Sequence, residues 1–239
     1  MHDTHNRGKE VLRLFVKYGA PESILYDAKP HIGTDILAKV VKNIREAIIS
    51  MGGEVRFHTK VTGIRTKRSI DFSDEPALAM LHLEDTRTNI GEDLLTDVAV
   101  LAIGHSARDT FRLLNLSDIK MEPKPFAVGV RVEHPQDMID ESQYGKNAPE
   151  SLPAAAYKLT AKTKEGRGVY TFCMCPGGYV VNASSEENRL AVNGMSYSGR
   201  NGKNANSAVI VTVSPEDFPE KGILRRSGFS APIRKSCIC

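Results

Sequence analysis

The chain of 239 residues carries 32 Lys and Arg against 29 Asp and Glu, so its formal net charge is only +3, and 41% of its residues are hydrophobic. This length fits one large or two modest domains, and so small a net charge does not favour a nucleic-acid partner. No apolar run approaches the ~20 residues that span a bilayer, and the polar first residues form no signal-peptide core. Four cysteines in a chain of this size indicate no disulfide framework. We therefore expect a cytoplasmic protein with neither a nucleic-acid nor a membrane partner.

An amphipathic helix is predicted over residues 8–18, and a second helix follows the loop Lys29–Asp35. Thr34 or Asp35 can cap the second helix, because a side-chain oxygen at a helix N-terminus accepts an unpaired backbone N–H. Gly52-Gly53 ends it, since glycine adopts a positive φ at low cost. The apolar positions of this helix recur at helical spacing and form one stripe: Leu37, Val40, Val41, Ile44 and Ile48.

Alternating polar and apolar residues predict a strand over 55–61, and two shorter strands of a meander follow at 77–84 and 92–96. Residues 99–103 are apolar without polar alternation, which is typical of a strand buried on both faces of a parallel sheet. A turn at Ile103-Gly104 follows this strand.

Residues 106–109 resemble a capping box and predict a further helix. The fold class predicted for residues 1–123 is therefore α/β, with a parallel sheet. The loop Lys29–Asp35 would lie at the carboxyl edge of that sheet, where α/β proteins bind ligands.

Residues 124–214 have a different character and predict a mostly β domain that begins after Pro123 and Pro125. Residues 215–239 show no clear hydrophobic period, and we expect this tail to be disordered. The strands expected in the β-rich domain are 126–132, 168–172, 179–181, 190–192 and 208–213.

Three blocks of sequence carry a family resemblance. The first runs from Gly19-Ala20-Pro21 through the loop Lys29–Asp35 to Gly52–Phe57, and the second is Leu101–Asp109 followed by Lys124–Arg131. The third is Cys173–Gly178, with Asn193–Ser196 and Asn204–Ser207. Together they resemble the uncharacterised FAD-dependent, or NAD(FAD)-utilising, dehydrogenase-like proteins, which have the glutathione-reductase-type FAD fold. The resemblance implies a partial FAD-binding α/β domain over 1–123 with a β-rich substrate domain inserted at 124–214.

The resemblance also implies the roles of particular residues. Val61 would meet the adenine, Ile103 and Gly104 would form the turn near the FAD pyrophosphate, and His105 would make a polar contact with the ligand. The residues expected to face the flavin or the substrate, or to line the cleft, are Lys29, His31, Gly33, Thr34, Cys175, Gly177 and Gly178.

The function that the resemblance implies is an FAD-dependent oxidoreductase with a small-molecule substrate, and NAD(P)H is a further candidate partner. The sequence identifies no catalytic residue. It contains no G-x-G-x-x-G turn, the element that cradles a dinucleotide pyrophosphate, and it lacks the family's glycine-rich C-terminal FAD segment. The chain therefore has the pattern of an internal fragment, and we expect it to hold FAD weakly by itself.

Two other readings remain. Cys173 and Cys175 with Cys237 and Cys239 would give the four thiolates of a structural zinc site, in a non-catalytic metal-binding module. C-x-C is not the usual C-x₂-C spacing, so we expect no metal and favour buried free thiols. The second alternative is an inactive remnant without a ligand.

Overall fold

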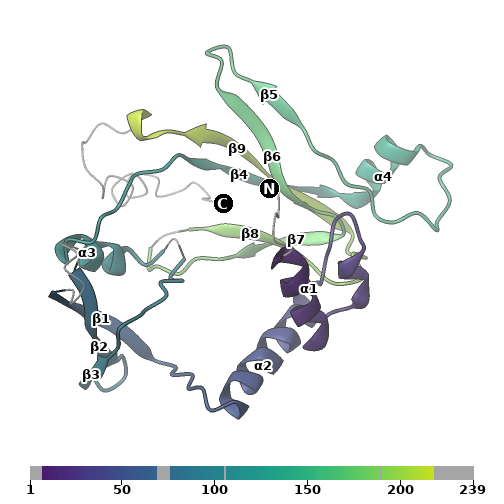
Figure 1. Cartoon of the computed structure of the whole chain (residues 1–239). Helices are drawn as coiled ribbons and strands as arrows, with labels where there is room; N and C mark the ends of the chain where they lie inside the picture. The colour runs from purple at the N-terminus through teal and green to yellow at the C-terminus, as the bar shows by residue number, and fades with distance from the viewer. Residues whose placement is uncertain (1–6, 69–75, 105, 189, 218–239) are drawn as a thin grey trace. The chain divides into compact units, whose positions relative to one another are not determined.

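The computed structural model describes residues 7–68, 76–104, 106–188 and 190–217 (Figure 1). The chain forms two compact units that do not follow chain order. Among the described residues, the first unit joins residues 7–55 with Phe126–Val213, and the second joins Arg56–Pro125 with residues 214–217. No helix within these described ranges is long and apolar enough to cross a membrane. The predicted division into a cofactor domain and a substrate domain concerns roles, and it stays a prediction.

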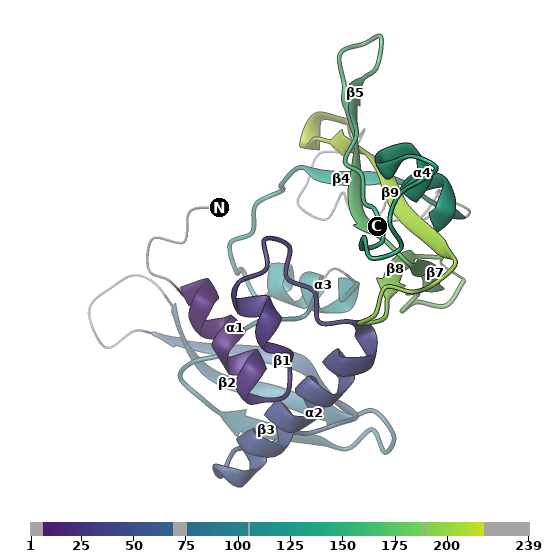
Figure 2. The ribbon, with the colours of Figure 1, turned by 90° about the vertical axis from the view of Figure 1, so that its right-hand side faces the viewer.

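Three helices open the first unit, namely α1 (Arg7–Lys17), the 3-10 helix η1 (Glu22–Leu25) and α2 (Thr34–Ser50). Figure 2 shows α1 and α2 side by side. The core of these helices is formed by Ala20, Ile24 and Val40, with apolar side chains of α1 and α2 packed around them. On α2 the buried face is Ile36, Val40 and Ile44, which recur every four residues. Two of the five predicted stripe residues, Val40 and Ile44, lie on this face, and the prediction was wrong for the other three, Leu37, Val41 and Ile48, which are exposed.

The two ends of α2 differ in how well the sequence predicted them. At the C-terminus, Gly52 has φ 89°, and its N–H and that of Gly53 bond the carbonyls of Ile49 and Ile48, so the predicted glycine end is confirmed. At the N-terminus the capping position is Gly33, and no side-chain capping bond forms. The expected cap by Thr34 or Asp35 was wrong, because both side chains bond another segment instead, as described below.

The rest of the first unit is β-rich, as predicted. A four-stranded antiparallel sheet has the order β4-β9-β6-β5, and a separate two-stranded sheet pairs β7 with β8. Strand β9 lies inside the larger sheet, and most of its residues are buried. The elements are β4 (Phe126–Pro135), α4 (Gln136–Tyr144), β5 (Thr160–Lys162), β6 (Gly168–Cys175), β7 (Gly178–Asn182), β8 (Val192–Ser196) and β9 (Asn204–Val213).

The second unit contains an antiparallel meander, β1-β2-β3, followed by α3 (Arg108–Leu116). Strands β2 and β3 correspond to the predicted meander, and β1 overlaps the separate strand predicted at 55–61. The capping position of α3 is Ala107, which makes no side-chain capping bond, so the expected capping box was wrong. The carboxylate of Asp109 accepts the N–H of Thr110 within the first turn at 2.9 Å and pairs with Lys60 of β1, with 2.5 Å between Oδ2 and Nζ. The strands are β1 (Thr59–Arg68), β2 (Pro76–Asp85) and β3 (Gly91–Leu95), and the 3-10 helix η2 (Pro215–Asp217) follows Ser214.

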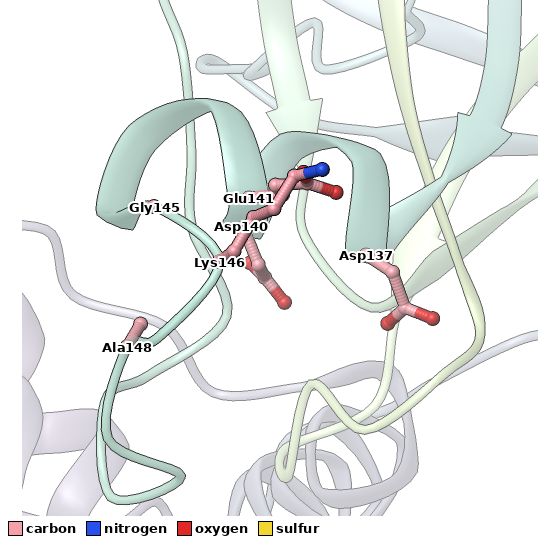
Figure 3. A pocket seen from close by; sticks show the side chains of 6 residues that line it. All are labelled: Asp137, Asp140, Glu141, Gly145, Lys146 and Ala148. Carbon is pink, nitrogen blue, oxygen red and sulfur yellow. The ribbon is translucent and has the colours of Figure 1, made fainter.

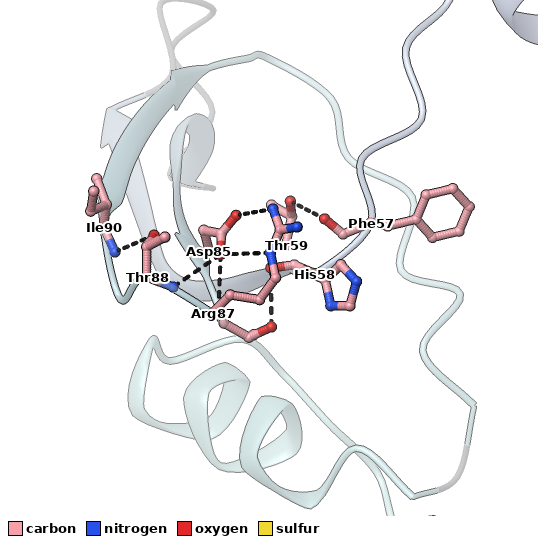
Figure 4. Close-up of polar contacts among 8 residues, drawn as sticks. Phe57, His58, Thr59, Asp85, Arg87, Thr88 and Ile90 are labelled. Carbon is pink, nitrogen blue, oxygen red and sulfur yellow. Dashed lines mark hydrogen bonds and ion pairs between the residues drawn. The ribbon is translucent and has the colours of Figure 1, made fainter.

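The turn between β2 and β3 is organised by one carboxylate (Figure 4). Asp85 accepts the backbone N–H groups of Arg87 and Thr88 at 2.8 and 3.2 Å, and it pairs with the Arg87 guanidinium at 2.9 Å. These interactions, with the Arg87 guanidinium first, hold the pKa of Asp85 well below its usual value. The Thr86 N–H bonds the carbonyl of His58, which ties the turn to the start of β1.

The expectation of a parallel sheet was not met, because every strand pairing within the described residues is antiparallel. Residues 99–103 form no strand, and Val100 and Leu101 are 86% and 48% exposed. A strand buried on both faces needs a paired strand at each edge, and the described residues supply none. The predicted strand 55–61 also begins late, at Thr59. Helices and strands coexist as predicted, but in antiparallel sheets.

Candidate functional site

The loop Lys29–Asp35 meets a loop that lies more than 160 residues further along the chain. His31 Nε2 lies 3.1 Å from the carbonyl oxygen of Tyr197 and 3.4 Å from the hydroxyl of Ser196. A carbonyl only accepts, so the bond to Tyr197 requires a proton on His31 Nε2. Thr34 adds a longer bond, at 3.4 Å, from its hydroxyl to the carbonyl of Ser196. We call this meeting of residues 31–35 with residues 196–198 the junction.

Asp35 makes the shortest hydrogen bonds of the junction. Its carboxylate accepts the Ser198 hydroxyl at 2.7 Å and the Ser198 backbone N–H at 2.9 Å. The hydroxyl bond, and then the N–H bond, lower the pKa of Asp35 from its usual value, because both stabilise the ionised form. The ionised carboxylate therefore holds the loop between β8 and β9, residues 197–203, which we call the serine loop, against the first turn of α2.

Gly33 permits the two loops to approach this closely. It is buried, its φ is 87°, and a Cβ at this position would collide with the backbone of Ser198. Any other residue would both strain this backbone conformation and push the serine loop away. The prediction that Gly33 allows a close approach thus matches its surroundings, although what approaches here is another part of the protein.

Two further predicted residues lie on the other side of the serine loop. Gly177 has φ 54°, its carbonyl accepts the N–H of Gly202 at 3.1 Å, and a Cβ on it would collide with the carbonyl of Arg200. Gly178 pairs with Ser196 across β7 and β8. The glycine turn therefore supports the same loop that the junction holds from its other side.

Gln136, which the sequence analysis did not single out, fixes this glycine turn. Its buried side-chain oxygen accepts the N–H of Gly177 at 2.8 Å, and its amide nitrogen donates to Asp140 and to the carbonyl of Ala155. Three bonds from one buried amide leave it a single orientation. No local pattern marks such a residue, because all its partners depend on the fold.

A hollow of about 410 Å³ lies beside the junction and carries mixed charge. Lys29, His31 and Arg200 supply cationic or hydrogen-bonding groups, and Asp27 supplies one carboxylate. The buried Nε of Arg200 has no hydrogen-bond partner within the described residues. A buried donor without a partner is costly, so Arg200 has an unmet hydrogen-bonding group next to this hollow. The lining residues are Pro21, Ser23, Asp27, Lys29, His31, Ile32, Ile36, Ser198, Gly199 and Arg200.

A second hollow, of about 440 Å³, surrounds the end of α4 but lacks the features of a site (Figure 3). Its carboxylates do not converge on one point. Asp140 is already bonded to Gln136 and to the N–H of Ala155, and Glu141 pairs with Lys146 at 3.3 Å. Within the described residues, no group of three His, Cys, Asp or Glu side chains could hold a metal. Cys237 and Cys239, which the zinc reading requires, lie outside those residues.

The remaining predicted residues lie elsewhere. Cys175 belongs to the first unit but bonds Arg131 of β4 instead of lining the hollow. Val61 is in β1 of the second unit, beside a bulge in its pairing with β2. Ile103 and the exposed Gly104, with φ 67°, lie in the segment without strand pairing. His105 lies outside the described residues. Their cofactor roles stay predictions.

Comparison with known proteins adds two findings. Residues 125–238 match the family model described as FAD-dependent protein, C-terminal domain-like. The chain is also 49% identical over 221 residues to an uncharacterized protein of Clostridium beijerinckii. The aligned region covers 92% of this chain and 39% of that relative. The chain thus spans about two fifths of the relative's length. These matches support the resemblance as far as an FAD-dependent family, and they name no substrate or activity.

Proposed function

We propose that this chain forms part of an FAD-dependent oxidoreductase and supplies one wall of its ligand site. The observation that carries the proposal is the family match over residues 125–238, the region that contains both the serine loop and the glycine turn. A bound flavin would accept a hydride or electrons from a small-molecule substrate. NAD(P)H is a second candidate partner, which would reduce the flavin in the same way. The protein's own part in such chemistry is to bind, to orient and to exclude water.

The hollow beside the junction is the part of the chain that fits this role. Its lining offers Lys29, His31 and the unpartnered Nε of Arg200, which suit a negatively charged or carbonyl group of a flavin or a substrate. We propose that Lys29 and Arg200 hold that group while His31, fixed by the carbonyl of Tyr197, sets the edge of the site. No side chain is assigned as acid, base or nucleophile.

The proposal includes a parallel-sheet FAD-binding domain to which residues 1–123 contribute. Residues 99–103 would become a central strand once strands from a longer polypeptide pair with both of its edges, and Val61, Ile103, Gly104 and His105 would then face the cofactor. The glycine-rich pyrophosphate turn would come from outside residues 1–239, since this sequence contains no G-x-G-x-x-G.

The test is flavin content. The 239-residue chain and the full-length Clostridium relative are purified, and flavin absorbance is measured per mole of protein. We expect the relative to be yellow with bound FAD and this chain to retain little, because much of the affinity for a dinucleotide comes from the pyrophosphate cradle. A relative that contains no flavin and takes none up would overturn the assignment. Stoichiometric FAD on this chain would show that it needs no further cradle.

The hollow is tested separately by titrating this chain with pyrophosphate while its backbone amide chemical shifts are recorded. Shifts are expected in residues 27–32 and 198–200, and R200Q should weaken binding about tenfold, as for the loss of one charge-assisted hydrogen bond. K203Q is the matched control, since Lys203 is an exposed cation of the same loop that does not line the hollow. Equal weakening by both variants would indicate a diffuse charge effect and contradict the site.

A further inference from the structure

A bulge in β6 brings two cysteines into one neighbourhood. Phe172 pairs with Ala208, and Cys175 pairs with Asn206, so β6 holds one more residue than β9 between these pairs. Cys173 lies in this bulge with φ 51°, a conformation that non-glycine residues seldom adopt. The Cys175 thiol donates to the Cys173 carbonyl at 3.3 Å, which places the Cys175 sulfur against the backbone of Cys173.

The two sulfurs differ in access. Cys173 is exposed and Cys175 is half-buried, and neither forms a disulfide. An exposed thiol meets dissolved reagents first, and a half-buried neighbour reacts more readily with the modified sulfur beside it than with the solvent. This division of access suits a pair in which one sulfur is attacked and the other resolves the product.

Arg131 of β4 places a positive charge at the same point. Its guanidinium donates to the Cys173 carbonyl at 2.7 Å, to Cys175 Sγ at 3.4 Å and to the Asn206 side-chain oxygen at 2.7 Å. Gly194 leaves room for this guanidinium, because a Cβ at that position would collide with it. Burial and the neighbouring Cys173 raise the pKa of Cys175, while Arg131 acts against them. A fixed cation beside sulfur stabilises the thiolate that forms during exchange.

We propose that Cys173 and Cys175 form a reversible dithiol–disulfide pair that is oxidised by hydroperoxides. This proposal is independent of flavin binding. The bulge interrupts the regular alternation of side chains at this point, and the contacts of Cys175 with the Cys173 carbonyl and of Arg131 with both residues hold the two cysteines in one neighbourhood. Its position is notable, since Pro176 and Gly177 follow at once and connect the pair to the loop of Arg200.

The reaction balances with one peroxide for each pair. The Cys173 thiolate attacks one peroxide oxygen, an S–O bond forms as the O–O bond breaks, and the departing hydroxide takes the proton of the thiol as water. The Cys175 sulfur then attacks Cys173 Sγ, an S–S bond forms as the S–O bond breaks, and the second hydroxide leaves as water with the Cys175 proton. Two thiols are oxidised by two electrons, and the peroxide is reduced to two waters.

The experiment uses the full chain with C237S and C239S, which leaves two of the four cysteines. This protein is treated with one equivalent of hydrogen peroxide, and its free thiols are counted after denaturation. We expect the count to fall from two to none in a monomer whose mass is two hydrogens lower, with full recovery in dithiothreitol. Two thiols that persist, or a loss that occurs through linked dimers, would overturn the proposal.

Single-cysteine controls in the same background assign the roles. The C175S variant should stop at a sulfenic acid on Cys173 that dimedone traps, and the C173S variant should react at least several-fold more slowly because its sulfur is half-buried. Both serine variants keep the side-chain volume close to that of cysteine, so circular dichroism should show an unchanged fold. Two results would contradict this order: a Cys175 thiol in C173S that is oxidised as fast as the thiols of the two-cysteine protein, or a C175S variant that forms no sulfenic acid.

Discussion

Residues 29–35, a loop that runs into the first turn of α2, and the segment 98–104, which precedes α3, differ in what holds them. The loop is polar, and its side chains are fixed by bonds to residues 196–198. The segment is apolar, yet Val98 and Val100 are 78% and 86% exposed. A few hydrogen bonds to a distant partner therefore order a polar loop, whereas an apolar run without a paired strand stays in the solvent.

The largest expected effect comes from adding a methyl group at Gly33, and a second glycine with positive φ serves as its control. Gly33→Ala should destabilise the first unit by about 3 kcal/mol, since strain of up to ~3 kcal/mol adds to the collision with Ser198. Gly104→Ala is the matched control, because a Cβ there would meet no atom within 4 Å. It should cost about 1 kcal/mol, the ordinary cost of a left-handed alanine. Urea unfolding followed by circular dichroism measures both, and equal losses would contradict the comparison.

A pH-dependent difference should come from Asp35. Its pKa is lowered in the folded protein, chiefly by the Ser198 hydroxyl, from a usual value of 3.8. The stabilisation is therefore fully present above about pH 4 and is lost as the pH falls through the folded value. Asp35→Asn should flatten this part of the stability curve, and Ser198→Ala should move the carboxyl titration seen by NMR back toward 3.8. A carboxyl titration unchanged by Ser198→Ala would show that the junction does not form in solution.

The smallest effect is expected in the apolar segment. Val100→Ser should change the stability of this chain by no more than about 0.5 kcal/mol, as for other exposed positions. In a longer polypeptide that buries residues 99–103, the same change should cost about 2 kcal/mol or more. Hydrogen exchange gives a second measure, with fast exchange at 99–103 in this chain and protection in the longer one. Protection in this chain would contradict the exposed segment.

The parts of the fold that the sequence predicted well are those set by local patterns. The glycine end of α2, the meander of β2 and β3 and the strands β4, β6 and β9 follow from turn residues and hydrophobic period. Helix α4 was missed, because its sequence has a weak apolar stripe and follows a proline. The strand at 99–103 was wrong, since its composition shows only that it suits burial and not whether a partner exists.

The candidate site divides in the same way. Gly33 was predicted as a point of close approach and Gly177 as a residue of the ligand cleft, because a glycine in a loop is a local signal. Their partners, Ser198 and Arg200, were not predicted, since those contacts join segments far apart in sequence. Arg200 lies in a loop with no local pattern that marks it, and its buried Nε without a hydrogen-bond partner is apparent only in the folded chain.

The separation of 163 residues between Asp35 and Ser198 has a consequence for folding during synthesis on the ribosome. At roughly 5–20 residues per second, a ribosome needs on the order of 8 to 33 s to reach Ser198 after it has made Asp35. During that interval α1, η1 and α2 can assemble their own small core, which depends on neighbours in sequence. The first turn of α2 stays exposed during this time, because the Ser198 groups that bond Asp35 have not yet been synthesised. Nascent chains halted before residue 196 should therefore be the form most open to chaperones and proteases.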